Sequence, residues 1–177
     1  MQRLFVALPI PDDVARSLAP LQGGVPGASW QSREQLHLTL RFVGEVDGRA
    51  AAALHDALAA IAAPPFTLDL HGVGSFGGKR PRALWAGIRP NAALLHLQRK
   101  VETAVQRAGL AAERHKYTPH VTLAHLHGAD LGRVMEYLGA HALYAAPPIA
   151  VGGFILYSSL LSGDGSVYRA EQAYRLR

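Results

Sequence analysis

Two four-residue stretches of this chain each place a threonine two positions after a histidine. They are His37-Leu38-Thr39-Leu40 and His120-Val121-Thr122-Leu123. The chain has nine histidines and five threonines in 177 residues, so chance placement predicts fewer than one such pair. Residues i and i+2 of a β-strand lie on one face, so each stretch presents an imidazole beside a hydroxyl, with leucines on the other face. Each stretch can therefore supply half of an active site.

Such a pair of halves fits the cleavage of a phosphodiester bond. Histidine titrates near pH 6.5, so one imidazole can accept a proton while the other donates one. In-line displacement at phosphorus requires a base on the attacking side and an acid on the leaving side. The hydroxyls of Thr39 and Thr122 can donate hydrogen bonds to the non-bridging oxygens. The alternative, two ordinary polar pairs in a core or at a sheet edge, explains one copy better than two in register.

Three landmarks repeat at a single offset along the chain. The motif histidine, an aspartate suited to cap a helix and a Pro-Pro pair each recur 83 positions later, at 37 and 120, 47 and 130, and 64 and 147. This agreement predicts an internal repeat of approximately residues 3–79 and 82–177 within a single domain, residues 1–177. We expect an α+β fold of two pseudo-symmetric lobes, each a small, mostly antiparallel sheet with helices on its outer face. The motif strands would face a central cleft.

Hydrophobic periodicity predicts the elements that position the two motifs. Strands are expected at 3–8, 36–43, 66–70, 83–88, 149–157 and 167–176, and helices at 12–21, 49–61, 94–108 and 131–143. Between two of these strands, Gly72, Gly74 and Gly77 match a dinucleotide-binding spacing, but a strand rather than a helix follows. A glycine-rich turn is expected there instead.

Composition places the chain among globular proteins. It is 49% hydrophobic and 18% charged, and it lacks cysteine, which excludes disulfides and a thiolate nucleophile. Neither a signal peptide nor a run of about 18 apolar residues is present, so we expect a cytoplasmic protein without a membrane partner. The net charge of +5 suggests an anionic partner, although ordinary surface solvation explains it equally well.

With their flanking residues, the motifs resemble the 2H phosphoesterase superfamily, and within it the RNA 2′,3′-cyclic phosphodiesterases also called 2′-5′ RNA ligases. The likeness is carried by residues 36–44, 118–124, 3–9, 64–68, 80–85 and 156–160. It implies opening of a 2′,3′-cyclic phosphate on RNA to a 2′-phosphomonoester, without a metal or other cofactor. It also implies that His37 is the proton donor and His120 the proton acceptor. The two motifs themselves are symmetric and do not distinguish these roles.

One position departs from the pattern of this family. Many relatives carry an arginine where this chain has His125, and histidine is a cation only at lower pH. Either Arg41, which strand alternation places on the face of His37, or one of Arg82, Arg114 and Lys116 would then cover the phosphate, or activity is weaker or shifted to acid pH. Tyr117 can stack on a base. The predicted substrate contacts are Arg41, Arg82, Tyr117 and His125.

The remaining histidines and the basic residues admit other interpretations. His115, His125 and His127 lie near His120, but no carboxylate or cysteine stands at a usual ligand spacing, so no metal site is predicted. The odd offsets of His125 and His127 also aim them at the opposite strand face. We expect a monomer acting on RNA ends or small cyclic nucleotides. The alternatives are 2′-5′ ligation of cleaved RNA halves, and a non-catalytic RNA-binding module using the basic run 79–82.

Overall fold

A computed structural model describes all 177 residues. The strands are β1 (Gln2–Pro9), β2 (Ala28–Trp30), β3 (His37–Val46), β4 (Phe66–Leu68), β5 (Leu70–Phe76), β6 (Ala83–Ile88), β7 (His120–Leu126), β8 (Ile149–Val151), β9 (Gly153–Ser162) and β10 (Gly165–Arg175). The helices are α1 (Asp12–Leu18), α2 (Gly48–Ala59), α3 (Ala92–Arg107) and α4 (Leu131–Ala140), with short 3₁₀ turns at Ala19–Leu21 and Arg33–Gln35. The expected α+β class is confirmed.

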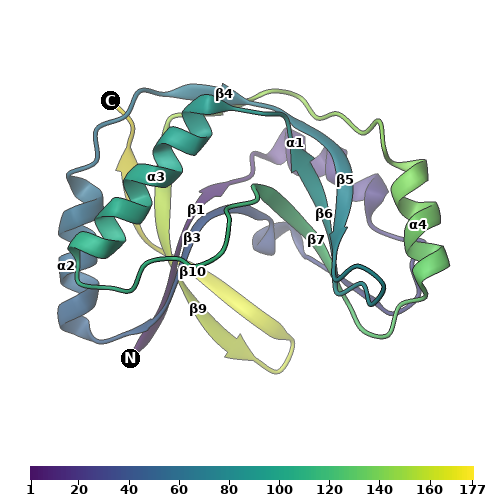
Figure 1. The fold of residues 1–177 in the computed structure, drawn as a ribbon, viewed down its shortest axis with the longest axis horizontal. Helices are drawn as coiled ribbons and strands as arrows, with labels where there is room; N and C mark the ends of the chain where they lie inside the picture. The colour runs from purple at the N-terminus through teal and green to yellow at the C-terminus, as the bar shows by residue number, and fades with distance from the viewer.

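One long antiparallel sheet carries both motif strands. Its order is β10-β9-β1-β3-β7-β6-β5, with β2 added beside β7, while β4 and β8 form a separate two-stranded sheet. The strands β3 and β7 meet at the centre through a single residue pair, Leu38 with Val121. The sheet therefore divides there into two lobes, which curve away from each other on either side of the motif strands (Figure 1).

The registers of both sheets follow an approximate two-fold axis. Leu38 pairs with Val121, and in the small sheet Thr67 pairs with Ala150. Both pairs join residues that are 83 positions apart, so each residue faces its own counterpart in the other half of the sequence. Antiparallel self-pairing of this kind is what a two-fold axis through the sheet produces.

Neither lobe is built from one half of the sequence alone. Strand β9 comes from the second half but lies beside β1, and β5 comes from the first half but lies beside β6. Helix α3 also comes from the second half, and it packs against α2 and β3 of the first half (Figure 1). Each half therefore covers a sheet edge that the other would leave unpaired. The repeat halves 3–79 and 82–177 do not coincide with the lobes.

Matching caps start the two helices that follow the motif strands. The carboxylate of Asp47 accepts a hydrogen bond from Ala50 N at 2.8 Å, and that of Asp130 accepts one from Arg133 N at 3.0 Å. Each cap satisfies a backbone donor that the first helical turn leaves free. The chain is thereby turned from each motif strand into its helix at an equivalent point.

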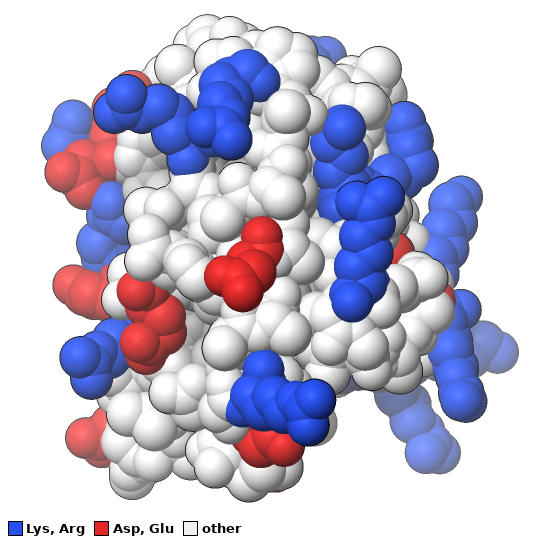
Figure 2. All heavy atoms as spheres, turned by 90° about the vertical axis from the view of Figure 1, so that its left-hand side faces the viewer, with Lys and Arg blue, Asp and Glu red and all other residues white.

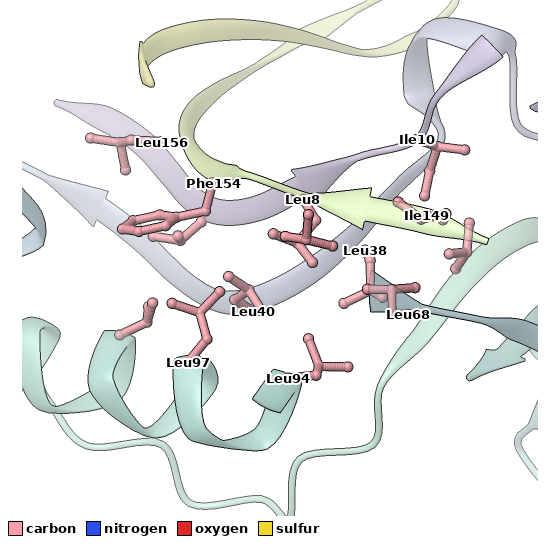
Figure 3. Close-up of a cluster of buried hydrophobic side chains, with 14 of the residues drawn as sticks. Leu8, Ile10, Leu38, Leu40, Leu68, Leu94, Leu97, Ile149, Phe154 and Leu156 are labelled. Carbon is pink, nitrogen blue, oxygen red and sulfur yellow. The ribbon is translucent and has the colours of Figure 1, made fainter. Parts of the chain in front are cut away.

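The leucines of the first motif anchor β3 in the main core. Leu38 and Leu40 are at most 1% exposed and point from β3 toward Leu94 and Leu97 of α3 (Figure 3). Fully burying a leucine side chain contributes roughly 1.5–3 kcal/mol. This cluster includes residues of both motif strands, Val121 and Leu123 among them. The faces that carry histidine and threonine are thus fixed by the burial of the opposite faces.

Residues 70–76 form a strand where a glycine-rich turn was expected. Gly74 lies opposite Trp85 in the β5–β6 ladder, and a Cβ on Gly74 would stand 2.2 Å from Cη2 of that indole. A glycine at this position lets the tryptophan lie flat across the neighbouring strand. The tight turn comes later, where Gly77 has φ +105°.

No helix of the structure combines the length and the apolar character that a membrane span requires.

Candidate active site

Backbone carbonyls hold both motif imidazoles in the same way. His37 Nδ1 lies 2.7 Å from the carbonyl oxygen of Gln35, and His120 Nδ1 lies 2.6 Å from that of Thr118. A carbonyl oxygen only accepts, so each Nδ1 carries the proton and donates it. Nε2 is then the nitrogen of each ring that can accept or deliver a proton. The contacts are 83 positions apart and equivalent under the two-fold axis.

Aromatic side chains surround both imidazoles. The His37 ring lies 4.9 Å from Phe5 and 5.2 Å from Tyr168, measured between ring centroids. The His120 ring lies 4.8 Å from Phe76 and meets it edge to face. Burial lowers the pKa of both histidines below 6.5, against the opposing effect of the carbonyl at each Nδ1. His120 also lowers the pKa of His37 through charge repulsion.

The pairing of Leu38 with Val121 also determines where the two threonines lie relative to the histidines. In the antiparallel register fixed by Leu38 and Val121, position 122 lies across from position 37, and position 39 lies across from position 120. Each imidazole therefore has a threonine on its own strand and another on the facing strand. Thr39 and Thr122 are half-buried, on the face away from the core. The register therefore places the four motif side chains next to one another across the two strands, and their catalytic roles stay a prediction.

Equivalent β-bulges interrupt both motif strands just after the threonines. Thr39 and Arg41 pair with consecutive residues of β1, which leaves Leu40 as an extra residue. Thr122 and Ala124 likewise pair with consecutive residues of β6 and leave out the residue between them. A bulge shifts the alternation of the strand, so the next side chain changes face.

The bulge in β3 corrects the interpretation of Arg41. Its side chain is buried at 8% exposure, and the bulge means that regular alternation does not align it with His37. Nε lies 2.5 Å from Glu102 Oε2, Nη2 donates to the carbonyl of Ala111 at 2.5 Å, and Nη1 donates to the carbonyl of Phe42. These donors are bound to protein atoms, and a phosphate contact by Arg41 stays a prediction.

The bulge in β7 corrects the orientation of His125. Strand alternation aimed it away from His120, but after the bulge it is exposed while Ala124 and Leu126 on either side are buried. His125 therefore lies on the face that carries His120 and Thr122. Its contact with substrate stays a prediction. His125 and His127 are both exposed, and no cluster of three or more potential metal-ligating side chains occurs.

A cavity of about 330 Å³ opens beside His120 and Thr39. Three of the predicted contacts, Arg41, Arg82 and Tyr117, line it, as does Lys116. The Arg82 guanidinium carbon lies 5.9 Å from the centre of the Phe76 ring. Tyr117 donates its hydroxyl to the carbonyl of Thr39 at 2.8 Å, and burial raises its pKa. The cavity thus joins cations and aromatic surface to the second motif.

The charges of the molecule are unevenly paired. Arg33, Arg41 and Arg133 form ion pairs with acidic side chains. Arg82 and Lys116 beside the cavity form no ion pair. On the face formed by α2, basic and acidic side chains are interspersed (Figure 2). The unpaired cations at the cavity are the part of the +5 charge that bears on an anionic ligand.

Some residues of the site could not be identified from the sequence. Gln35 and Thr118 act through their carbonyls, which carry no residue-specific signal, although their shared offset of 83 hints at equivalence. Tyr168 and Phe76 reach the imidazoles from strands that are paired only in the folded sheet. Phe5, by contrast, is buried as core packing predicts.

Comparison with known proteins places this geometry in a family. The model of the 2'-5' RNA ligase superfamily matches residues 10–158. A protein of Aeropyrum pernix named RNA 2',3'-cyclic phosphodiesterase is 33% identical over 149 residues, which cover 82% of this chain and 84% of the relative. A protein of the same name from Geobacillus stearothermophilus is 35% identical over 127 residues, 68% of this chain but 40% of that longer protein.

A solved structure shares nearly the whole fold. The crystal structure of Escherichia coli LigT complexed with 3'-AMP superposes with a TM-score of 0.79 at 26% identity, covering 99% of this chain and 98% of LigT. The family match covers most of the chain, including both His-x-Thr motifs. The chain therefore belongs to the 2'-5' RNA ligase superfamily, the 2H phosphoesterases.

Proposed function

We propose that this protein hydrolyses RNA 2′,3′-cyclic phosphodiester ends to 2′-phosphomonoesters by paired-histidine general acid–base catalysis. The observation that carries the proposal is the two-fold arrangement of His37 and His120, each held at Nδ1 with Nε2 left for substrate. The relatives named RNA 2',3'-cyclic phosphodiesterase support the substrate class. The proposal covers a monomer, because one chain supplies both halves of the site.

The proposed reaction assigns one role to each motif. Water attacks phosphorus while Nε2 of His120 takes its proton, and His37 delivers a proton from Nε2 to the departing 3′ oxygen. The P–O3′ bond breaks and the phosphate remains on the 2′ oxygen. Thr39 and Thr122 stabilise the charge on the non-bridging oxygens, with Arg82 and Lys116 as further cations and His125 as a further hydrogen-bonding group. The assignment of acid and base follows the family likeness.

The direct test is hydrolysis of 2′,3′-cyclic mononucleotides in EDTA, with phosphorus NMR to identify the product. We expect a 2′-phosphomonoester. Replacing His37 or His120 by glutamine should lower kcat by about 10²–10⁴-fold, the usual contribution of a positioned acid or base. The matched control is His96→Gln, an exposed histidine on α3. Wild-type turnover by either motif variant would overturn the proposal.

Ligation through a 2′-5′ linkage is a second candidate, favoured by the description of the matching family. It is the same displacement at phosphorus, with a 5′ hydroxyl in place of water as the nucleophile and the 3′ oxygen again leaving, so the two activities can coexist. Incubating cleaved RNA halves with the protein and measuring the ligation equilibrium determines which direction dominates. A non-catalytic RNA-binding module would instead retain salt-sensitive RNA binding and show no turnover, whether or not both histidines are present.

A further inference from the structure

The segment between α3 and the second motif, residues 108–119, contains neither helix nor strand. It nevertheless forms one wall of the cavity beside His120, through residues 113 and 115–118. It also supplies two contacts of the site, the Tyr117 hydroxyl on Thr39 and the Thr118 carbonyl on His120. The position of this segment, called here the second pre-motif loop, therefore bears directly on the site.

The corresponding segment before the first motif, residues 25–36, is fastened by backbone pairing. Within it, β2 pairs with β7, and Gln31 N donates to the carbonyl of Leu123 at 2.8 Å. The second pre-motif loop has no such strand against β3. The two-fold symmetry is broken at this point, so the loop must be fastened in another way.

Arg41 supplies that fastening from the bulge of β3. Its guanidinium binds the loop directly through the carbonyl of Ala111 and indirectly through Glu102 of α3. Glu102 Oε1 accepts a hydrogen bond from Glu113 N at 3.0 Å, so the carboxylate joins β3, α3 and the loop. Burial raises the pKa of Glu102, but hydrogen bonds from Glu113 N and Arg41 outweigh it and leave the carboxylate ionised.

We propose that Arg41 is a positioning residue, which through Glu102 and Ala111 holds the second pre-motif loop against β3 and so sets Tyr117 and His120 opposite Thr39. A planar guanidinium can bind a carboxylate and two carbonyls at once, whereas an ammonium cannot reach all three from one point. The proposal rests on the proposed function only for its catalytic consequence. The ordering of the loop is independent of substrate.

The test combines hydrogen exchange with kinetics in three variants: Arg41→Met, Arg41→Lys and Glu102→Gln. In Arg41→Met we expect amide exchange of residues 110–118 to accelerate while β1, β9 and α2 keep their protection. For cyclic mononucleotides we expect kcat to fall by up to about 100-fold, the effect of small displacements at a reacting centre. KM should change by less than kcat, because a positioning residue acts on the loop and makes no bond of its own to substrate. Lysine should not restore the rate.

The control is Arg133→Met, which breaks an exposed pair with Glu136 on α4 and should change neither readout. Glu102→Gln, which keeps the shape of the side chain, should loosen the same loop, and adding it to Arg41→Met should cause little further loss. A rise in KM with unchanged loop exchange would overturn the proposal in favour of a direct phosphate contact. Exchange accelerated throughout the protein would overturn it in favour of a purely structural role.

These outcomes are separate from those of the proposed function. If the wild-type protein is inactive on cyclic phosphates, the proposed function is wrong. Faster amide exchange confined to the loop in Arg41→Met would still support the proposal that Arg41 holds the loop. Conversely, active wild type with unaltered loop exchange in the variants would remove only the role of Arg41.

Discussion

Each motif imidazole can exchange protons with substrate only through Nε2, since Nδ1 is held by a carbonyl. The proposed acid–base mechanism requires one ring protonated and the other neutral. Burial lowers the pKa of both rings, and the nearby His120 lowers that of His37 further. The mixed protonation state is therefore most populated below pH 6.5, the ordinary histidine value.

We predict a bell-shaped dependence of kcat/KM on pH with its maximum below 6.5. The sign follows because kcat/KM reports the free enzyme, in which both pKa values are lowered, while a phosphodiester keeps one negative charge throughout. Initial rates on a cyclic mononucleotide between pH 4.5 and 8.5, at constant ionic strength, check this. His96→Gln should leave the profile unchanged, and a maximum above pH 7 in the wild type would contradict the expectation.

At the residue scale, the sequence identifies the motif side chains but not the role of Arg41. The histidines and threonines are recognisable because they occur twice with the same spacing. The face of Arg41 was inferred from regular alternation, which the bulge at Leu40 breaks. That bulge depends on the register between β3 and β1, which no local pattern of β3 encodes.

At the scale of elements, β5 and β6 build the aromatic wall next to His120. Trp85 lies opposite both Gly74 and Thr122, so its indole extends along the face of the sheet that carries His120. The ring centroids of Trp85 and His120 are 6.1 Å apart. The glycines in residues 71–78 suggest a loop, so the sequence does not predict strand β5. The packing of Trp85 on Gly74 explains why a glycine occurs within this strand.

Substituting Gly74 with alanine should therefore damage both stability and activity. The added Cβ would stand 2.2 Å from the indole and push it toward His120 and Phe76. We expect a loss of about 1–3 kcal/mol in the free energy of unfolding, the usual effect of overpacking, with a lower kcat. Urea unfolding and steady-state kinetics measure the two effects.

The matched control is Gly139→Ala, since a Cβ on that helical glycine meets nothing within 4 Å. This substitution should stabilise the protein by about 0.5–1 kcal/mol through helix propensity. Equal effects of the two substitutions would show that the contact between Gly74 and Trp85 does not matter.

At the scale of the whole molecule, the two halves of the sequence are interleaved rather than adjacent. The 83-residue offset anticipated the two-fold relation, and the structure adds that Leu38 and Val121, which are 83 positions apart, pair with each other. The exchange of β5 and β9 between lobes could not be anticipated, because a repeat shows which segments are equivalent and not which ones pair. The exchange matters for folding, because neither half of the chain can complete a lobe alone.

One core cluster of 32 residues accordingly runs through both lobes. We predict a single cooperative unfolding transition in urea. Both tryptophans, Trp30 on β2 and Trp85 on β6, report on one lobe, whereas the long helices α2 and α3 dominate the circular dichroism of the other. The fluorescence and circular dichroism midpoints should therefore coincide.

Leu38→Ala at the junction should lower the free energy of unfolding by roughly 2–5 kcal/mol and move both midpoints together, whereas Leu161→Ala, 78% exposed, should move neither. Midpoints that separate in the wild type would mean that the lobes fold independently and that the shared core does not couple them.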